Sequence, residues 1–303
     1  MKKNLFNETI TDIYSWKAYW KSEDKYMPLV KHIYETNNMD FGNISTPPKS
    51  TNPVFRVGET ILKVFYPFEK AIEDGGDYTA ELEGLKFCKN LGINVPDILC
   101  NGMIYDSLCS FPYIVMTYID GVEADTVFEK YSLSEQVEFV KQLRKLNDTI
   151  SITTNINIPR YDESLRINHS NWSIMPESFR EDRKRFIENY DFPEPVFNQG
   201  DFAECNIIID KQGRLNMIDF ASCLIAPRYY EMPFWDEAVL MEAYYGDFKN
   251  DCFYDALLMD TLIYFGGAFN IKNDAKILGI DFNSITSVDV LKNILIERVN
   301  KIS

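Results

Sequence analysis

The chain has 303 residues, of which 46% are hydrophobic and 25% charged, a balance typical of globular proteins and long enough for two domains or two lobes. Its 46 acidic and 31 basic residues give a net charge of −15, which disfavours nucleic-acid and anionic-membrane partners and favours cationic ones. The N-terminus lacks the apolar core of a signal peptide, and no apolar run reaches the roughly 20 residues of a membrane span. The six cysteines form no CxxC pair. We therefore expect a reduced cytoplasmic protein.

The first 65 residues combine a helical pattern with strand patterns. Apolar residues at loose helical spacing over residues 5–20 predict a short helical segment. The stretch NISTPPKSTNP at 43–53 is rich in Ser, Thr, Asn and Pro and predicts a loop. VFRVGETILKVF at 54–65 contains two β-rich runs separated by Gly58-Glu59, which predicts a hairpin.

The next segments alternate between helix and strand before helices take over. Residues 77–92 carry apolar side chains along one helical face. Strand-like runs follow at 97–104 and, more strongly, at 111–119. Ser132 and Glu135 have the spacing of a capping box ahead of an amphipathic helix. The last hundred residues are mostly helical by pattern.

This order predicts an α+β protein of two lobes, a sheet-rich front and a helix-rich back, joined near Asp120-Gly121. We place the N-terminal lobe, with its helical extension, at residues 1–119 and the C-terminal lobe at residues 120–303.

The segment FNQGDFAECNIIIDKQGRLNMIDFA, residues 197–221, concentrates the polar groups that suggest chemistry. Two short strands joined by a turn at 211–213 would form a hairpin. Asn206 then begins one strand and Asp219 ends the other, at the same end of the hairpin, and Asp201 lies in the loop just before. Mg²⁺ prefers a few such oxygen ligands, with its other positions left for water and phosphate. A carboxylate off the metal could orient or deprotonate a hydroxyl.

The Gly-Asp sequence followed by NIIID and MIDFA resembles the aminoglycoside phosphotransferase and choline kinase family, the small-molecule branch of the protein-kinase-like fold. TNPVFRVGETILKVF is similar to the first hairpin of that family, and ELEGLKFCKNLGINVPDIL to the helix that follows. PYIVMTYIDG resembles its strand into the hinge between lobes, and APRYYEMP the segment after the second Asp. The matches span residues 45 to about 235 in the family's order.

The resemblance implies a kinase that transfers the γ-phosphoryl group of ATP or GTP to an alcohol of a small molecule. Asp201 would be the catalytic residue that accepts or orients the proton of the acceptor hydroxyl. Asn206 and Asp219 would hold Mg²⁺ against the β- and γ-phosphates.

The resemblance also implies the nucleotide-binding residues. Lys63 would contact the α- and β-phosphates, and Glu81 would orient it, although Glu83 is a nearby competitor for that role. Backbone groups in the hinge strand would hydrogen-bond the base, and the residues assigned to this are Met116, Tyr118 and Ile119.

Two positions and one loop depart from the family pattern. Gln199 stands where relatives have a His two residues before the catalytic Asp, and Asn147 stands where relatives often have His. A Gln amide both donates and accepts hydrogen bonds, so we expect Gln199 to brace the loop. The loop STPPKSTN would replace a glycine-rich phosphate cover, although it contains no Gly.

The acceptor is the part that the sequence leaves open. Net acidity suits a cationic acceptor such as an aminoglycoside, with a role in antibiotic resistance, or an amino alcohol; nucleosides remain open as well. Acidic side chains of the helical back could pair with ammonium groups: Asp236, Glu237, Glu242, Asp247, Asp251 and Asp255. The alternative is a non-catalytic nucleotide-binding module of the same fold, and a protein kinase ranks last because DFA stands where Asp-Phe-Gly is expected. The oligomeric state stays open.

Overall fold

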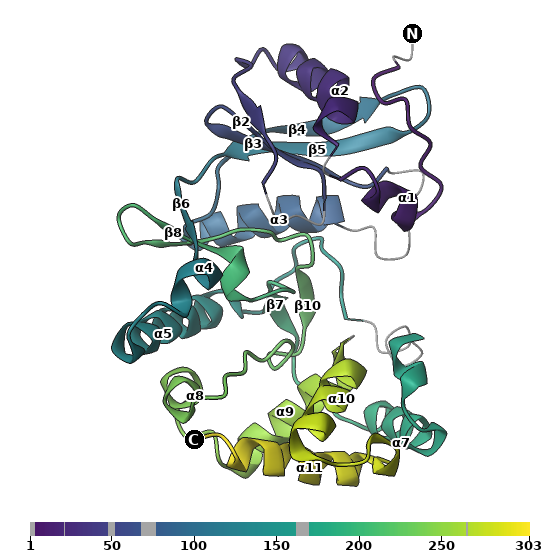
Figure 1. Cartoon of the computed structure of the whole chain (residues 1–303), viewed down its shortest axis with the longest axis vertical. Helices are drawn as coiled ribbons and strands as arrows, with labels where there is room; N and C mark the ends of the chain where they lie inside the picture. The colour runs from purple at the N-terminus through teal and green to yellow at the C-terminus, as the bar shows by residue number, and fades with distance from the viewer. Residues whose placement is uncertain (1–3, 21, 48–51, 68–76, 162–169, 265) are drawn as a thin grey trace. The chain divides into compact units, whose positions relative to one another are not determined.

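A computed structural model of the chain describes residues 4–20, 22–47, 52–67, 77–161, 170–264 and 266–303 (Figure 1). The chain divides into two compact units. The first unit consists of Met1–Thr126, Ile156–Ile158 and Cys205–Ser222; the second consists of Val127–Asn155, Pro159–Glu204 and Cys223–Ser303. The predicted assignment of a nucleotide-binding lobe to 1–119 and a catalytic lobe to 120–303 stays a prediction.

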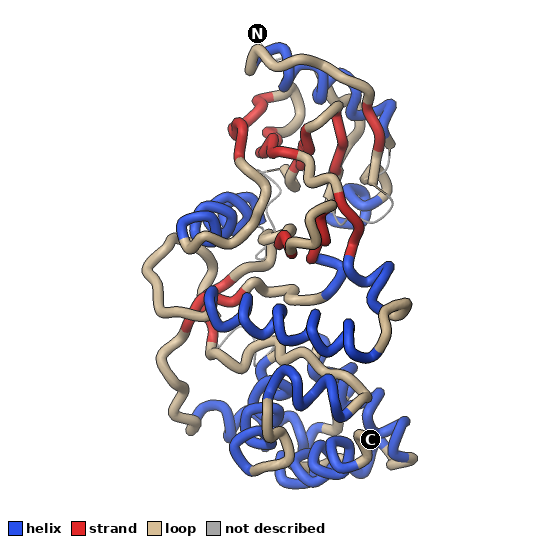
Figure 2. The backbone as a smooth tube through the Cα atoms, turned by 90° about the vertical axis from the view of Figure 1, so that its left-hand side faces the viewer, coloured by secondary structure: helices blue, strands red, loops and turns tan. Residues whose placement is uncertain are grey.

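The first unit is built on a five-stranded antiparallel sheet in the order β1-β2-β3-β5-β4. Val57 pairs with Thr60, so the turn between β2 and β3 is Gly58-Glu59, as predicted. Gly58 adopts φ +60°, a conformation that favours glycine. The strands, coloured red in Figure 2, are β1 (Ile44–Ser45), β2 (Val54–Val57), β3 (Thr60–Val64), β4 (Ile98–Tyr105) and β5 (Ser110–Thr117).

Helices cover both faces of this sheet, with α2 (Glu23–Thr36) on one side and α3 (Asp77–Asn90) on the other (Figure 1). The apolar face of α2 joins the buried sheet residues in one core, together with the loop residue Phe6. The predicted helix over 5–20 is realised only at α1 (Ile13–Lys17), where Asp12 and Ser15 form a reciprocal capping box. The preceding apolar residues are buried as loop instead.

A second sheet of the first unit contains the polar segment singled out above. Its strands are in the order β6-β8-β9, with β6 at Gly121–Glu123, β8 at Ile207–Asp210 and β9 at Leu215–Met217. The carboxylate of Asp210 accepts the N–H groups of Gln212 and Arg214 across the turn. These two hydrogen bonds stabilise the turn and explain why the predicted hairpin forms at this place in the sequence.

The second unit is mainly helical around one large apolar core. Ser132 and Glu135 form the predicted capping box at the start of α5. Two short strands, β7 (Val196–Asn198) and β10 (Leu224–Ala226), pair antiparallel. Its helices are α5 (Leu133–Ile150), η2 (Ser170–Ile174), α7 (Glu177–Glu188), α8 (Ala238–Tyr245), α9 (Asp251–Ile263), α10 (Gly267–Leu278), η4 (Phe282–Ser284) and α11 (Val288–Asn300). Two further helices contain a boundary between the units: α4 (Ala124–Phe128) begins in the first unit and ends in the second, and η3 (Glu204–Asn206) begins in the second and ends in the first.

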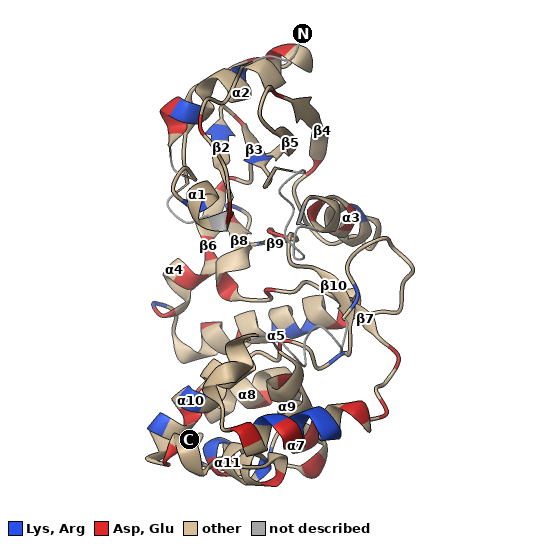
Figure 3. Cartoon of the chain, turned by 90° about the vertical axis from the view of Figure 1, so that its right-hand side faces the viewer, with Lys and Arg blue, Asp and Glu red and all other residues tan. Residues whose placement is uncertain are grey.

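Charge is distributed along the helices of the second unit rather than collected by sign. Acidic and basic residues alternate along α7, as the red and blue segments of its ribbon in Figure 3 show. Within the described residues, no helix is both long and apolar enough to span a bilayer. The predicted α+β architecture is therefore confirmed.

Candidate active site

Lys63, on β3, is the centre of a buried polar cluster in the first unit. Its Nζ donates to Oε2 of Glu81 on α3, at 2.7 Å, and to Oδ1 of Asp219, at 2.8 Å. Lys63 and Glu81 are 5% and 1% exposed, so the pair is withdrawn from water. Glu83, the competing partner, instead pairs with Lys86. Three of the predicted residues are thus brought together by direct contacts.

Electrostatics within this cluster favour the ionised forms of the lysine and of Asp219. Burial by itself opposes the charge on Lys63, but the nearby carboxylates of Asp219 and Glu81 outweigh it and raise the lysine pKa. Burial likewise acts to raise the pKa of Asp219, but the charge of Lys63 and its hydrogen bond hold that pKa below its ordinary value. For Glu81 burial prevails, and its pKa is raised. The lysine therefore remains a fixed cation.

Asp219 has a strained backbone, with φ +58° in the left-handed region that non-glycine residues rarely adopt. Such strain costs of order 1–3 kcal/mol and concentrates at functional sites. Next to it, the N–H of Ile218 donates to the carbonyl of Asn206 at 3.0 Å. That bond places the end of β9 beside the start of β8, the juxtaposition that the sequence predicts for Asn206 and Asp219.

The donor types of these two residues fit Mg²⁺. Magnesium is usually bound through one or two carboxylates plus waters and substrate phosphates, and not by a dedicated protein cage. Asp219 offers a carboxylate whose side chain is 37% exposed, and Asn206 offers an amide oxygen. No group of three or more His, Cys, Asp and Glu ligands forms among the residues that the structure describes.

The predicted base-binding strand is β5 and the residues after it. Met116 is 5% exposed and pairs with Ile61 of β3 and with Ile98 of β4. The N–H of Tyr118 donates to the carbonyl of Glu59, so it is engaged within the protein. Binding of a base by Met116, Tyr118 and Ile119 stays a prediction. The predicted phosphate cover, residues 45–52, lies partly outside the described residues, at 48–51.

Asp201 lies in an exposed loop of the second unit, and side chains hold the backbone of that loop. The Asp201 N–H donates to Oε1 of Gln199 at 2.8 Å, and Gln199 is 2% exposed. Gln199 therefore braces the loop, as its ability both to donate and to accept hydrogen bonds predicts. Gly200 adopts φ +86°, which glycine permits without strain.

Two carboxyl groups lie behind this loop. Glu231 Oε2 accepts the N–H of Phe202 at 3.4 Å, and Asp260 Oδ1 accepts the N–H of Glu231 at 2.7 Å. Burial, followed by the charge of Asp201, raises the pKa of Glu231 to about 8. Burial raises the pKa of Asp260 to about 7, although backbone N–H groups of Glu231 and Met232 counteract it.

These two pKa values make the stability of the protein depend on pH. Both groups bind protons more tightly in the folded chain than in the unfolded chain, where carboxyl groups titrate near 4. The contribution of these two groups to the free energy of unfolding is therefore largest at low pH, and it falls as the pH rises from about 5 to about 8. Chemical denaturation between these pH values should show this decline, and Asp260→Asn should flatten it. A slope equal in the wild type and Asp260→Asn would contradict the assignment.

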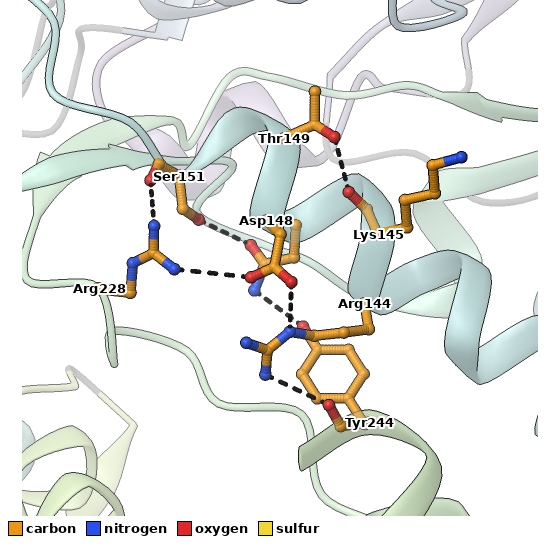
Figure 4. Close-up of polar contacts among 8 residues, drawn as sticks. Arg144, Lys145, Asp148, Thr149, Ser151, Arg228 and Tyr244 are labelled. Atoms are coloured by element: carbon orange, nitrogen blue, oxygen red, sulfur yellow. Dashed lines mark hydrogen bonds and ion pairs between the residues drawn. The ribbon is translucent and has the colours of Figure 1, made fainter. Parts of the chain in front are cut away.

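Asn147, the other position that departs from the family pattern, also serves as a brace. Its amide donates to the Tyr244 hydroxyl at 2.8 Å and accepts from the Ser151 hydroxyl at 3.0 Å. Beside it, Asp148 lies between the guanidinium groups of Arg144 and Arg228 (Figure 4).

An open depression of about 430 Å³ adjoins this network on α5. It is lined by Lys141, Arg144, Lys145, Asp148, Thr149 and Ala243. Because cations dominate its lining, the depression does not suit a cationic acceptor.

Two of the acidic side chains considered for the acceptor form ion pairs within the protein. Asp236 pairs with Arg298, and Asp255 pairs with Lys292 at 2.6 Å. A role of any of the six in binding the acceptor stays a prediction.

Asp260 is the residue that sequence reasoning missed. A signal was present, since Asp260 is the one charged residue in the run ALLMDTLIYF, whose neighbours form the core of the second unit. A carboxyl group in such a run must find hydrogen-bond donors when the helix is buried. Glu231 was noted only as a possible loop brace, and its contact with the Asp201 loop depends on tertiary packing.

Comparisons with known proteins add the fold relationship. No protein-family model matches the chain. No curated protein matches it in sequence.

Solved structures match over most of the chain. A GDP and kanamycin complex of the phosphotransferase APH(2'')-IIIa has a TM-score of 0.60 and 14% identity, covering 89% of this chain and 99% of the other. The streptomycin–ATP–APH(2'')-IIa ternary complex has a TM-score of 0.56 and 14% identity, with coverages of 87% and 97%. An apo thermostable mutant of aminoglycoside phosphotransferase APH(4)-Ia has a TM-score of 0.54 and 14% identity, with coverages of 88% and 98%.

The predicted kinase-like architecture is thereby confirmed, since the matches cover nearly the whole length of both partners. The chain has the fold of the aminoglycoside phosphotransferases.

Proposed function

We propose that the chain is a Mg²⁺-dependent phosphotransferase that moves the γ-phosphoryl group of ATP or GTP to a hydroxyl of a small cationic molecule. The observation that carries this proposal is the contact of Lys63 with both Glu81 and Asp219. Kinases of this fold require a strand lysine paired with a helix glutamate, together with a metal-binding aspartate. The strained backbone of Asp219 supports the same assignment.

Each residue then has a part in phosphoryl transfer. Lys63 binds the α- and β-phosphates, oriented by Glu81. Asn206 and Asp219 would hold Mg²⁺, and the metal would neutralise charge on the phosphates. Asp201 orients the acceptor hydroxyl and accepts its proton as the new P–O bond forms and the bond to the leaving nucleoside diphosphate breaks.

A polyamine sugar is the acceptor class that the observations favour. The net charge of −15 attracts cations. Neighbours in fold were solved with kanamycin, streptomycin, gentamicin or hygromycin B. Both GDP and ATP complexes occur among them, so either nucleotide is a reasonable donor. Such an activity would confer antibiotic resistance from the cytoplasm.

The test is nucleoside diphosphate release by the purified chain with Mg²⁺ and ATP or GTP. The acceptor panel contains kanamycin, gentamicin, streptomycin, hygromycin B, amino alcohols and nucleosides. We expect release that depends on one class of acceptor and stops when the metal is chelated. Mass spectrometry of the acceptor should show the addition of one phosphoryl group.

Two other outcomes would contradict the proposal in different ways. Nucleotide binding without transfer to any acceptor would favour the non-catalytic module. A lack of nucleotide binding, measured by calorimetry with Mg²⁺ present, would overturn the assignment of the Lys63 cluster as well.

A further inference from the structure

The loop Gly200–Phe202 has an acceptor for each of its three backbone N–H groups. Glu231 accepts from Gly200 and Phe202, on either side of Asp201. Gln199 accepts from Asp201 itself. A loop whose donors are all bonded to side chains can adopt one conformation only while those side chains stay in place. The direction of the Asp201 carboxylate thus depends on the side chains that hold the backbone of its loop.

Glu231 is itself held in an unfavourable conformation. Its φ is +61°, and for a residue with a long side chain this conformation needs compensation by surrounding contacts. The contact that supplies it comes from α9, where Asp260 accepts the N–H groups of Glu231 and Met232. Asp260 is 8% exposed and sits beside core residues, so its position is fixed by the packing of α9.

The charges around these two residues do not explain their presence as an ion-pair network. Neither Glu231 nor Asp260 forms a salt bridge with Lys, Arg or His among the described residues. The titratable groups that face them are Asp201 from the loop and, toward Asp260, Tyr245 from α8. Burying the carboxyl groups of Glu231 and Asp260 near Asp201 without a cation costs free energy. We take their hydrogen bonds to the backbone as the structural reason for their presence.

We propose that Asp260 and Glu231 are positioning residues acting in series: Asp260 fixes the backbone of Glu231, and Glu231 fixes the backbone of Gly200–Phe202 and hence the direction of Asp201. The inference rests on the proposed function, because only there does the direction of Asp201 matter. A misplacement of about 1 Å at a reacting group can cost about 10²-fold in rate. Asp260 on the buried face of α9 thereby helps to orient the residue that meets the acceptor hydroxyl.

Local amide hydrogen exchange tests the brace without any need for activity. Glu231→Ala and Asp260→Ala should speed exchange in peptides covering residues 199–204. Glu231→Gln and Asp260→Asn retain an acceptor oxygen and should leave that exchange near the wild-type rate. Glu297→Ala, on α11, is the matched control, since this exposed carboxylate pairs with Lys301 on its own helix and is far from the loop in sequence. Thermal unfolding confirms that each variant is folded.

Steady-state kinetics give the second readout. Glu231→Ala should lower kcat by about 10²-fold while the KM for nucleotide stays within about threefold, and Glu231→Gln should recover most of the loss. A variant that only destabilises the fold would instead lower the melting temperature and leave kcat of the folded fraction unchanged.

The outcomes separate the two proposals. Unchanged exchange at 199–204 in both Ala variants would overturn the brace, whatever the activity. Faster exchange confined to this loop, together with a wild type that phosphorylates no acceptor, would support the brace and overturn the kinase proposal. Equal exchange in the Ala and the amide variants would also overturn the brace, because hydrogen-bond acceptance would then be irrelevant.

Discussion

Replacement of Asp201 by Ala is expected to lower kcat for phosphoryl transfer by about 10²–10⁴-fold, the usual contribution of a positioned general base. The side chain is exposed, whereas the loop is held through backbone N–H groups. Truncation therefore removes the carboxylate without removing the contacts that shape the loop. Nucleotide affinity should change little, since the residues assigned to nucleotide binding are Lys63 and Glu81 and the hinge residues.

Initial rates at saturating nucleotide, with the acceptor concentration varied, check this prediction. Asp201→Asn separates charge from shape, because the amide can still accept a hydrogen bond but cannot take a proton, and it should be nearly as inactive as Asp201→Ala. Asp191→Ala is the control, an exposed carboxylate ten positions earlier with no assigned role. A fall in kcat of less than about tenfold in both Asp201 variants would remove Asp201 from the catalytic role.

Replacement of Lys63 by Met is expected to have two separable effects. Nucleotide binding should weaken strongly, because the cation that would meet the phosphates is lost. The fold should also lose about 3–5 kcal/mol of stability, the usual cost of leaving a buried charge without its partner. The reason is local: Glu81 is 1% exposed and its side chain bonds to Lys63 at 2.7 Å.

A double substitution distinguishes these effects. Lys63→Met with Glu81→Gln removes the uncompensated charge, so the free energy of unfolding measured with urea should recover in large part. Nucleotide affinity measured by calorimetry should stay weak in the double variant. Lys86→Met, which breaks the exposed pair with Glu83, is the control and should change stability by no more than about 1 kcal/mol. Full nucleotide affinity in Lys63→Met would contradict the assignment of the lysine.

Features that arise from neighbouring residues were predictable from the sequence. The Gly58-Glu59 turn, the Ser132–Glu135 capping box and the β8–β9 hairpin each depend on contacts within a few positions. Their physical causes are local: positive φ at glycine, side chains bonded to nearby backbone, and alternation of apolar residues. The predicted helix at 5–20 was shorter because burial against α2, and not helical periodicity, places those apolar residues.

The proximity of Lys63, Glu81 and Asp219 could not be predicted from local sequence patterns. Lys63 and Glu81 are 18 positions apart, and Lys63 and Asp219 are 156 apart, so no local pattern relates them. Their expected proximity came from the resemblance of ordered motifs to a known family. The structure adds the distances, the burial and the strained backbone of Asp219.

The sequence by itself determined the alternation of elements, the position of the polar hairpin and the candidates Asp201, Asn206 and Asp219, because these depend on residues close together in the chain. Only the tertiary structure decided that Glu81 and not Glu83 pairs with Lys63, that Gln199 holds the Asp201 backbone, and that Asp260 supports Glu231 from α9. A hydrogen bond between residues 29 positions apart forms only when helix packing brings donor and acceptor within about 3 Å, and that packing is a property of the whole core.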